Sequence, residues 1–396
     1  MDFMPKRKPE IKGLYYITHI DNVPSILQHG ILSHHRIEQE RVPFTPIYDA
    51  AIVNRRQNRT TATGKSLWEY ANLYFQARNP MLYRVLHEKK PFEVAVLGVD
   101  PAVLQHDGSV IATGNAASAE SEFLPAKTGL DAIGNMWSVI SAEWWNDTDG
   151  SKRKIMAECL VPGQVSPEHI HSIYVSSHDV VPKVPKSATS RTVEVVPEPR
   201  MFFRPANRYS ITKRLSLVDG DMFFSEMQTL TVSVNTVGVM GKGLASRAKY
   251  QFPDVYVVYQ DACRSRKLTG TRPYLYKRES YLDEELADDP GSLISTNAKK
   301  WFLLFATKKH WRDRSQLGDI ASGLQWLREN VKTEGITSLA MPALGCGLGG
   351  LEWKDVGPVM CSELGGLGIP VAIYLPREKE IAPEYLSKGH LLGSQI

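Results

Sequence analysis

The chain has 396 residues, a formal net charge of +4 and four cysteines. This length predicts two domains of about 200 residues each, and so small a charge does not by itself indicate nucleic-acid binding. The cysteines form no CxxC pair, and no run approaches about 18 apolar residues. The N-terminus also lacks the apolar stretch of a signal peptide. We therefore expect a reduced, cytoplasmic protein with no structural metal and no membrane span.

Strand-like segments in the first half of the chain are short and irregularly spaced, and this favours an α+β domain. They cover residues 15–17, 92–97, 155–160 and 171–175. Between the first two lies the basic run VNRRQNRTT, which contains Arg55, Arg56 and Arg59. Such a run is either a solvated helix face or a surface that contacts phosphates.

An acidic residue, Glu158, interrupts the apolar run of residues 155–161. Burying an unpaired carboxylate costs several kcal/mol, roughly, so the acid either serves a site, pairs with an interior arginine or faces outward from an edge strand. We favour a functional site. Nearby, His169 and His171 would share one side of a strand, and without a third ligand we interpret both as structural.

Residues 181–200 carry four prolines with interspersed charges and indicate an extended segment near a domain boundary. Residues 192–196 could still form a last strand of the first domain. We place the first domain at residues 1–204, a linker at 205–210 and the second domain at 211–396.

The second half alternates strand-like and helix-like segments, which predicts an α/β layered domain with ligands at the carboxyl ends of its strands. The segments are 229–234, 244–252, 301–306, 319–332, 336–341 and 371–374.

Two glycine-rich loops follow strands of this second half: NTVGVMGKG at 235–243 and PALGCGLGG at 342–350. Glycine lets the backbone approach a ligand, and a helix start favours negative charge, so two such loops indicate a clamp around a diphosphate. Neither loop has the spacing of a kinase or dehydrogenase motif. The alternative is that both are ordinary turns.

Four motifs of the second half resemble a macrodomain, and more narrowly the DarG class, which removes ADP-ribose from DNA bases. They are GDMF at 220–223, ATKKHWR at 306–312 and the two glycine loops. The resemblance covers roughly residues 211–378 and implies a three-layer α/β fold. It also implies that Lys308 is catalytic, because an amine of lowered pKa can attack the anomeric carbon of the distal ribose. The alternative is an ordinary surface lysine.

The same resemblance implies ADP-ribose as the ligand, with Asp221 at the position that reads the adenine amino group. The implied ADP-ribose contacts are Asp221, Met222, Asn235, Gly238, Val239, Met240, Gly241, Lys242, Gly243, Thr307, Gly345, Cys346, Gly347, Leu348 and Gly349.

Residues 11 to about 204 resemble DarT-type transferases, which use NAD to ADP-ribosylate a base in single-stranded DNA. The resemblance rests on four blocks in order: LYYITHIDNVPSILQHGIL at 14–32, IVNRR at 52–56, EYANLYFQARNPMLY at 69–83 and KIMAECLVP at 154–162. It implies that Glu158 and Arg56 are catalytic and that Arg55 and Arg59 contact DNA. The implied NAD contacts are Tyr16, Thr18, His19, Asn22, Tyr74 and Met81.

Two details of this first half stand apart from the motif match. Tyr16 occupies a position where many relatives have histidine. Tyr70, Tyr74 and Phe75 either stack on DNA bases or pack in the core, and core packing is the expected outcome for most of them.

Together the two resemblances predict a toxin and its antitoxin in one chain. The first domain would transfer ADP-ribose from NAD to thymine or guanine in single-stranded DNA, and the second would remove it. Two alternatives stay open: a macrodomain that only binds the modified DNA, and a transferase that modifies protein or RNA. The oligomeric state is not indicated.

Overall fold

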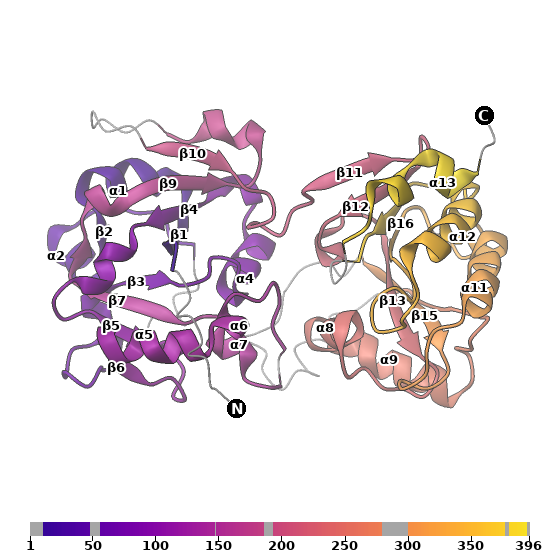
Figure 1. Cartoon of the computed structure of the whole chain (residues 1–396), viewed down its shortest axis with the longest axis horizontal. Helices are drawn as coiled ribbons and strands as arrows, with labels where there is room; N and C mark the ends of the chain where they lie inside the picture. Colours follow the sequence, from indigo (N-terminus) through magenta and orange to yellow (C-terminus); the bar gives the residue numbers. More distant parts are fainter. Residues whose placement is uncertain are drawn as a thin grey trace, which may run out of the picture. The chain divides into compact units, whose positions relative to one another are not determined.

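The chain divides into two compact units, Met1–Phe202 and Phe203–Ile396 (Figure 1). The structure, a computed structural model, describes residues 11–47, 56–146, 148–185, 193–278, 300–376 and 380–393. Residues 207–210, in the range that the sequence assigns to a linker, form strand β11 (Asn207–Ser210) of the second unit. This strand pairs with β12 (Leu215–Asp219), so its backbone belongs to a sheet.

Among the described residues, the first unit is built on an eight-stranded sheet in the order β10-β9-β4-β1-β3-β7-β5-β6. Neighbouring strands are antiparallel, except that β10 and β9 are parallel. A two-stranded pair, β2 (Ile31–Leu32) with β8 (Gln164–Val165), lies apart from it. The strands are β1 (Leu14–His19), β3 (Tyr70–Tyr74), β4 (Val94–Val99), β5 (Val110–Ala112), β6 (Phe123–Pro125), β7 (Glu158–Pro162), β9 (Ile170–Val175) and β10 (Glu194–Pro197).

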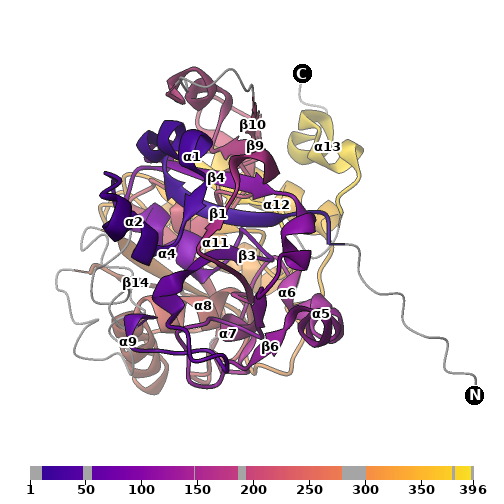
Figure 2. The ribbon, with the colours of Figure 1, turned by 90° about the vertical axis from the view of Figure 1, so that its left-hand side faces the viewer.

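Helices surround this sheet, so the predicted α+β class is confirmed. In Figure 2, α5 lies beside β6. The helix also packs on β5, where Gly129 allows a close approach, because a Cβ there would lie 2.5 Å from Ile111 Cβ. The α-helices are α1 (Val23–His29), α2 (His34–Glu40), α4 (Pro80–Glu88), α5 (Ala126–Asn135), α6 (Trp137–Ile140) and α7 (Ser151–Lys154). The 3-10 segments are η1 (Ile20–Asn22), η2 (Leu67–Glu69), η3 (Pro91–Glu93), η4 (Pro101–Gln105), η5 (Pro167–His169) and η6 (His178–Lys183).

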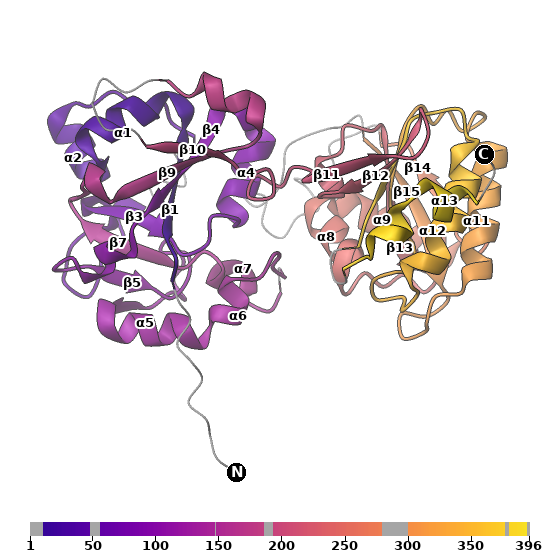
Figure 3. The same cartoon turned by 45° about the horizontal axis from the view of Figure 1, so that its top comes forward.

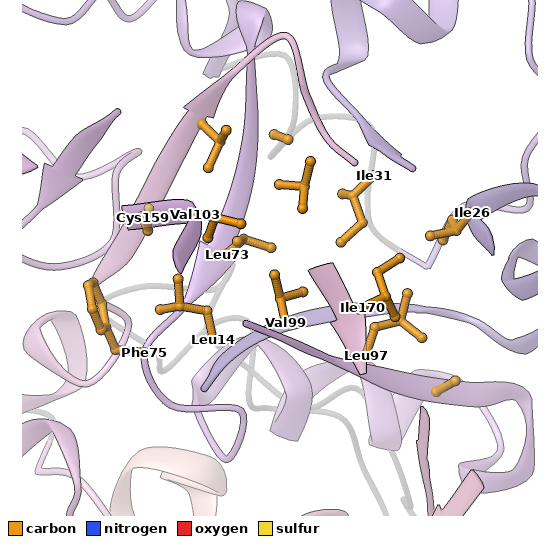
Figure 4. Packing of buried hydrophobic residues seen from close by; sticks show 14 of the residues in the cluster. Leu14, Ile26, Ile31, Leu73, Phe75, Leu97, Val99, Val103, Cys159 and Ile170 are labelled. Carbon is orange, nitrogen blue, oxygen red and sulfur yellow. The ribbon is translucent and has the colours of Figure 1, made fainter. Parts of the chain in front are cut away.

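The core of the first unit forms where strand side chains meet helix α1 and strand β2 (Figure 4). Leu14, Leu73 and Leu97 come from β1, β3 and β4, and Ile26 from α1 packs in the same cluster. Every residue of β4 is buried, as expected for a central strand covered on both faces.

The second unit has, among its described residues, a seven-stranded sheet in the order β11-β12-β17-β16-β13-β15-β14. Its five central strands run parallel, and the edge strands β11 and β14 are antiparallel to their neighbours. The carboxyl ends of the five parallel strands therefore share one edge, where ligands bind in such folds. The strands not yet named are β13 (Thr229–Asn235), β14 (Tyr274–Tyr276), β15 (Trp301–Lys308), β16 (Leu339–Pro342) and β17 (Val371–Tyr374).

Helices cover both faces of this sheet, and the three-layer α/β prediction is confirmed. Along β15, Leu303 and Phe305 pack with α11 and α12, while Phe302 and Leu304 pack with α8 and α9 on the other face. Figure 3 shows α11 and α12 side by side. The helices are η7 (Met222–Phe224), α8 (Gly243–Gln251), α9 (Pro253–Arg264), α11 (Leu317–Asn330), α12 (Trp353–Gly365), η9 (Pro383–Leu386) and α13 (Lys388–Leu392). Within the described residues, no helix combines the length and apolar character that a membrane span requires.

Candidate active sites

A cavity in the first unit collects five of the six NAD contacts predicted from the sequence. Its wall includes Tyr16, Thr18, Asn22, Tyr74 and Met81, which come from β1, η1, β3 and α4. Arg56 lines the same wall. The sixth residue, His19, instead caps η1, because its Nδ1 accepts a hydrogen bond from the Asp21 backbone N–H at 3.2 Å.

Glu158 and Arg56 form an ion pair beside this cavity. Glu158 begins β7 and is fully buried, and its Oε2 lies 2.8 Å from Arg56 Nη2. Its Oε1 accepts from Arg56 Nη1 at 3.3 Å and from the Ala116 backbone N–H at 2.9 Å. Glu158 is thus paired with an interior arginine, and that arginine also faces the cavity. A buried charge is tolerated here because it is paired and hydrogen-bonded.

The predicted strand of residues 155–160 begins later than expected. Residues 155–157 continue the turn after α7, because the Ala157 N–H donates to Lys154 O and the Met156 N–H to Arg153 O. The strand starts at Glu158, so the acid lies at its entry.

Two of the residues that line this cavity are tyrosines with raised pKa values. Burial and then the nearby Glu158 charge raise the pKa of Tyr74, which pairs with Glu158 in the β3–β7 register. Burial raises the pKa of Tyr16 to about 12. Both hydroxyls therefore stay protonated near neutral pH and can donate hydrogen bonds to a ligand.

Asn22 anchors the segment 42–47, which sequence reasoning missed. Its Nδ2 donates to Thr45 O at 2.8 Å and to Thr18 Oγ1 at 3.1 Å, and its Oδ1 accepts from the Thr45 N–H at 2.7 Å. Five residues of that segment line the cavity. The motif VPFTPI, an aromatic residue between two prolines, is the signal that could have drawn attention to it.

Aromatic rings gather where this segment meets α2 and η2. The His34 ring stacks on Trp68 with centroids 4.4 Å apart, and Phe44 meets His34 edge-on at 6.3 Å. Burial and the Arg56 charge lower the pKa of His34, although Glu38 opposes them. Sequence reasoning did not select any of these three residues.

The predicted DNA-contacting arginines have different outcomes. Arg55 lies outside the described residues. Arg59 donates to Ser121 O at 2.9 Å, and its guanidinium lies 4.9 Å from the centre of the Phe123 ring. Its role toward DNA stays a prediction.

The aromatic block at 69–83 separates into core and cavity residues. Tyr70 and Phe75 are buried in two hydrophobic clusters of the first unit, whereas Tyr74 lines the cavity. The expectation that His169 and His171 share one strand is wrong, because Pro167 starts η5 and places His169 before β9. Within the described part of the chain, no cluster of three or more His, Cys, Asp or Glu could hold a metal ion.

The first glycine loop of the second unit is organised by the side chain of Asn235. Its Oδ1 accepts from the N–H groups of Val237 at 3.0 Å and Val239 at 3.4 Å, and its Nδ2 donates to Val239 O at 2.6 Å. The buried Tyr259 hydroxyl, which sequence reasoning missed, donates to the Asn235 backbone O at 2.9 Å. Gly238 has φ +81°, a conformation that favours glycine.

The predicted ADP-ribose contacts of this loop include both buried and solvent-exposed residues. Met240 is buried, Gly241 and Lys242 are exposed, and Gly243 begins α8. On the adjacent strand β15, Thr307 is buried with its Oγ1 3.1 Å from Ser233 Oγ.

The second glycine loop is held by close backbone contacts. Gly345 has φ +73°. A Cβ on Gly349 would lie 2.3 Å from Ser315 Oγ and 2.5 Å from Gly345 O, so only glycine fits without movement. Cys346 is buried, while Gly347 and Leu348 form the exposed tip.

Lys308 lies between the two loops at the end of β15. It is the register partner of Asn235, and its Nζ donates to the carbonyl oxygens of Trp311 at 3.4 Å, Asp313 at 3.2 Å and Leu348 at 3.1 Å. A Cβ on Gly243 would lie 3.4 Å from Leu348 Cδ1. The structure therefore brings both loops and Lys308 to one edge of the sheet.

Asp221 has a partner that the sequence did not reveal. Its two carboxylate oxygens lie 2.9 and 2.8 Å from Arg247 Nη2, and its Oδ1 also accepts from the Phe223 N–H at 3.1 Å. The Arg247 guanidinium lies 4.7 Å from the centre of the Phe223 ring. The next residue, Met222, is buried in η7.

Comparisons with known proteins cover both units. Residues 15–203 match the family "ssDNA thymidine ADP-ribosyltransferase, DarT", and residues 294–360 match the macro domain family. A DNA ADP-ribosyl transferase–DNA ADP-ribosyl glycohydrolase fusion protein of Thermosipho africanus is 56% identical over 387 residues, 98% of this chain and 100% of that protein. A DNA ADP-ribosyl glycohydrolase of Mycobacterium bovis is 36% identical over 137 residues, 35% of each protein.

A solved structure also matches nearly the whole chain. It is Thermosipho africanus DarTG in complex with ADP-ribose, with a TM-score of 0.76 and 55% identity over 96% of this chain and 100% of that one.

Proposed function

Because the chain belongs to the family of DarT–DarG fusion proteins, we propose that it carries two opposed activities, one in each domain. The transferase domain, which corresponds to the unit Met1–Phe202, moves ADP-ribose from NAD to a base of single-stranded DNA. The macrodomain, which corresponds to the unit Phe203–Ile396, hydrolyses the bond that the transferase makes. Thymidine is the first base to test, since the description of the matching family names it. The observation that supports the proposal is that Arg56, the ion-pair partner of Glu158, lines the cavity of the first unit, while Lys308 lies between the two glycine loops of the second.

In the transferase reaction, NAD is a substrate held in the cavity of the first unit. Nicotinamide leaves with the electrons of its glycosidic bond, and a nitrogen of the base bonds to the anomeric carbon and loses its proton. The Glu158 carboxylate orients the ribose and stabilises the positive charge of the oxocarbenium-like transition state. Arg56 holds that carboxylate and faces the cavity, where it can contact NAD phosphates or the deprotonated base.

In the hydrolase reaction, the loops at 235–243 and 345–350 hold the diphosphate and distal ribose of the adduct through backbone groups. A nitrogen that donates three hydrogen bonds has no free lone pair, so Lys308 Nζ gives up a proton before the amine attacks the anomeric carbon. The DNA base leaves with the electrons of its glycosidic bond and takes up that proton. Water then displaces the lysine, which returns as an ammonium, and ADP-ribose is released. The three carbonyl oxygens keep Nζ between the two loops.

The activities also suggest where the protein works. NAD and DNA meet in the bacterial cytoplasm, and Cys159, Cys263, Cys346 and Cys361 are all free thiols. We place the fusion there as a toxin with its antitoxin. Neither reaction needs a metal ion.

The test compares four forms of the full chain incubated with labelled NAD and a single-stranded oligonucleotide. The wild type should leave little labelled DNA at steady state. Lys308→Ala should accumulate the adduct, since only removal is blocked, and Glu158→Gln should form almost none. Lys332→Ala is the matched control, because Lys332 is an exposed lysine that follows α11, outside both glycine loops, and it should behave as wild type.

Other outcomes would replace this proposal. If Lys308→Ala accumulates no adduct while the wild type modifies DNA, the hydrolase assignment fails. A wild type that binds ADP-ribose but leaves preformed adduct intact would make the macrodomain a binding module. Label on protein or RNA would assign a different substrate to the transferase.

A further inference from the structure

A short turn, residues 310–313, lies between the two glycine loops of the second unit. The Asp313 N–H donates to His310 O at 3.0 Å, and the His310 N–H donates to Asp313 Oδ2 at 2.9 Å. The turn is fixed on one side by Thr236 of the first loop, whose N–H and Oγ1 both donate to Lys309 O. On the other side the Ser315 N–H donates to Gly349 O of the second loop. The turn is therefore tied to both halves of the ADP-ribose site.

This turn carries an exposed aromatic side chain at its tip. Trp311 is 47% exposed, and the Arg312 guanidinium lies 4.5 Å from the centre of its ring. The His310 ring lies 5.2 Å away on the same turn. Exposing so large an apolar ring costs solvation free energy, so a contiguous apolar surface of this kind often marks an interaction site.

Three further exposed apolar side chains of the second unit lie in the two glycine loops themselves. Val237 and Val239 are in the first glycine loop, and Leu348, 67% exposed, is the tip of the second. Lys308 Nζ contacts the carbonyl oxygens of both Trp311 and Leu348. The apolar groups thus border the site on the side of the lysine that attacks the adduct.

The charge of the turn selects the class of partner. Lys309, Arg312 and Arg314 are all exposed, and the one acid among them, Asp313, is engaged by the His310 N–H. Exposed cations beside an aromatic ring match a nucleic-acid single strand, whose phosphates are negative and whose bases stack on aromatic faces. A protein partner with an apolar surface would bind the exposed apolar side chains without requiring three cations beside them.

We propose that Trp311 is a stacking platform for the DNA strand of the adduct, with Arg312 and Arg314 contacting its phosphates. This inference rests on the proposed hydrolase function. The base leaves from the anomeric carbon next to Lys308, so the nucleotides that flank it must pass the turn that holds Lys308. The backbone anchors keep Trp311 in place before DNA arrives, which lowers the entropy lost on binding. The platform recognises DNA that carries the adduct in preference to the nucleotide alone.

The test measures hydrolysis by the full chain on two substrates, an ADP-ribosylated oligonucleotide and the ADP-ribosylated mononucleoside. Trp311→Ala should raise KM for the oligonucleotide relative to KM for the nucleoside by about 5- to 150-fold, the range for one stacked base. Trp311→Phe should recover most of the loss. The double variant Arg312→Gln, Arg314→Gln should reduce the salt dependence of oligonucleotide KM by about two charges.

Matched controls lie outside both glycine loops, in the last turn of α11 and on α13. Arg328→Gln removes an exposed arginine, and Leu392→Ala trims an exposed apolar side chain. Neither should change the ratio of the two KM values.

Three results would separate the possible failures. An unchanged ratio in Trp311→Ala overturns the platform and leaves the apolar groups for a protein partner. An equal rise for both substrates also overturns it, because the side chain would then support the Lys308 loop. If the wild type hydrolyses neither substrate, the hydrolase proposal fails. Fluorescence anisotropy with the modified oligonucleotide then tests the stacking role of Trp311. A roughly 5- to 150-fold loss of affinity in Trp311→Ala supports that role, and an unchanged affinity overturns it.

Discussion

The two candidate sites differ in whether side chains or backbone groups form them. In the first unit a pair of charged side chains, Glu158 and Arg56, meets across 102 residues of sequence. In the second unit the site is made mainly of backbone: two glycine loops, with Lys308 held by three carbonyl oxygens. Activity at the first site should therefore be most sensitive to loss of a charged side chain. Ligand binding at the second site should be most sensitive to a Cβ added to a loop glycine.

Solvent access makes this contrast sharper. Glu158 is fully buried, so loss of its partner leaves a charge that water cannot reach. Lys308 is only half-buried, and its carbonyl partners are neutral. Removing the Lys308 side chain should therefore stop hydrolysis without destabilising its domain. Removing the Arg56 side chain should both stop transfer and destabilise the first unit.

The largest expected effect follows Arg56→Ala, which leaves the buried Glu158 carboxylate unpaired. The free energy of unfolding of the first unit should fall by about 3–5 kcal/mol, and transfer to DNA should be lost. Denaturant unfolding and a transfer assay measure the two effects. Lys308→Ala is the comparison and should change stability by less than about 0.5 kcal/mol. Equal destabilisation by both variants would erase the contrast between the sites.

Gly349→Ala should have the next largest effect, on the second site. The new Cβ would lie 2.3 Å from Ser315 Oγ, and the crowding should cost about 1–3 kcal/mol. Calorimetry should show weaker ADP-ribose binding because the loop must move. Gly366→Ala is the matched control, since Gly366 has φ −90° and open space around it. Normal binding by Gly349→Ala would mean that the loop shape is not critical.

Asn22→Ala tests whether the segment 42–47 shapes the NAD cavity. The substitution removes both hydrogen bonds to the Thr45 backbone, which should cost about 1–2 kcal/mol. We expect KM for NAD to rise by about tenfold as the segment loosens. ADP-ribose binding by the second unit is the internal control and should not change. A normal KM would show that the segment keeps its place without this anchor.

The smallest effect concerns pH. Burial and the Arg56 charge hold the pKa of His34 below its usual value of about 6.5. The contribution of neutral His34 to stability is therefore fully present above that pH and is lost as the pH falls through the lowered pKa. In thermal melts between about pH 7 and pH 5, His34→Gln should lose less stability than the wild type. Identical slopes would show that His34 titrates alike in the folded and unfolded chain.

Much of the fold could be predicted because local patterns carry it. Buried strands such as β4 and β15 are continuous apolar runs, and glycine after a strand marks a loop whose backbone must turn sharply. The motifs also located Glu158 and Lys308. Missed elements include α9, α12 and β3, and the aromatic residues of β3 fit either a strand or a helix.

By itself, then, the sequence determined the two-domain order and the fold classes, and it indicated the loops and residues that we propose for each site. Tertiary structure alone decided the partners: Arg56 for Glu158, Arg247 for Asp221 and Tyr259 for Asn235. The physical reason is that periodicity and backbone conformation depend on neighbouring residues, whereas an ion pair depends on which strand ends and helices pack together. The composition of a short motif does not specify that packing.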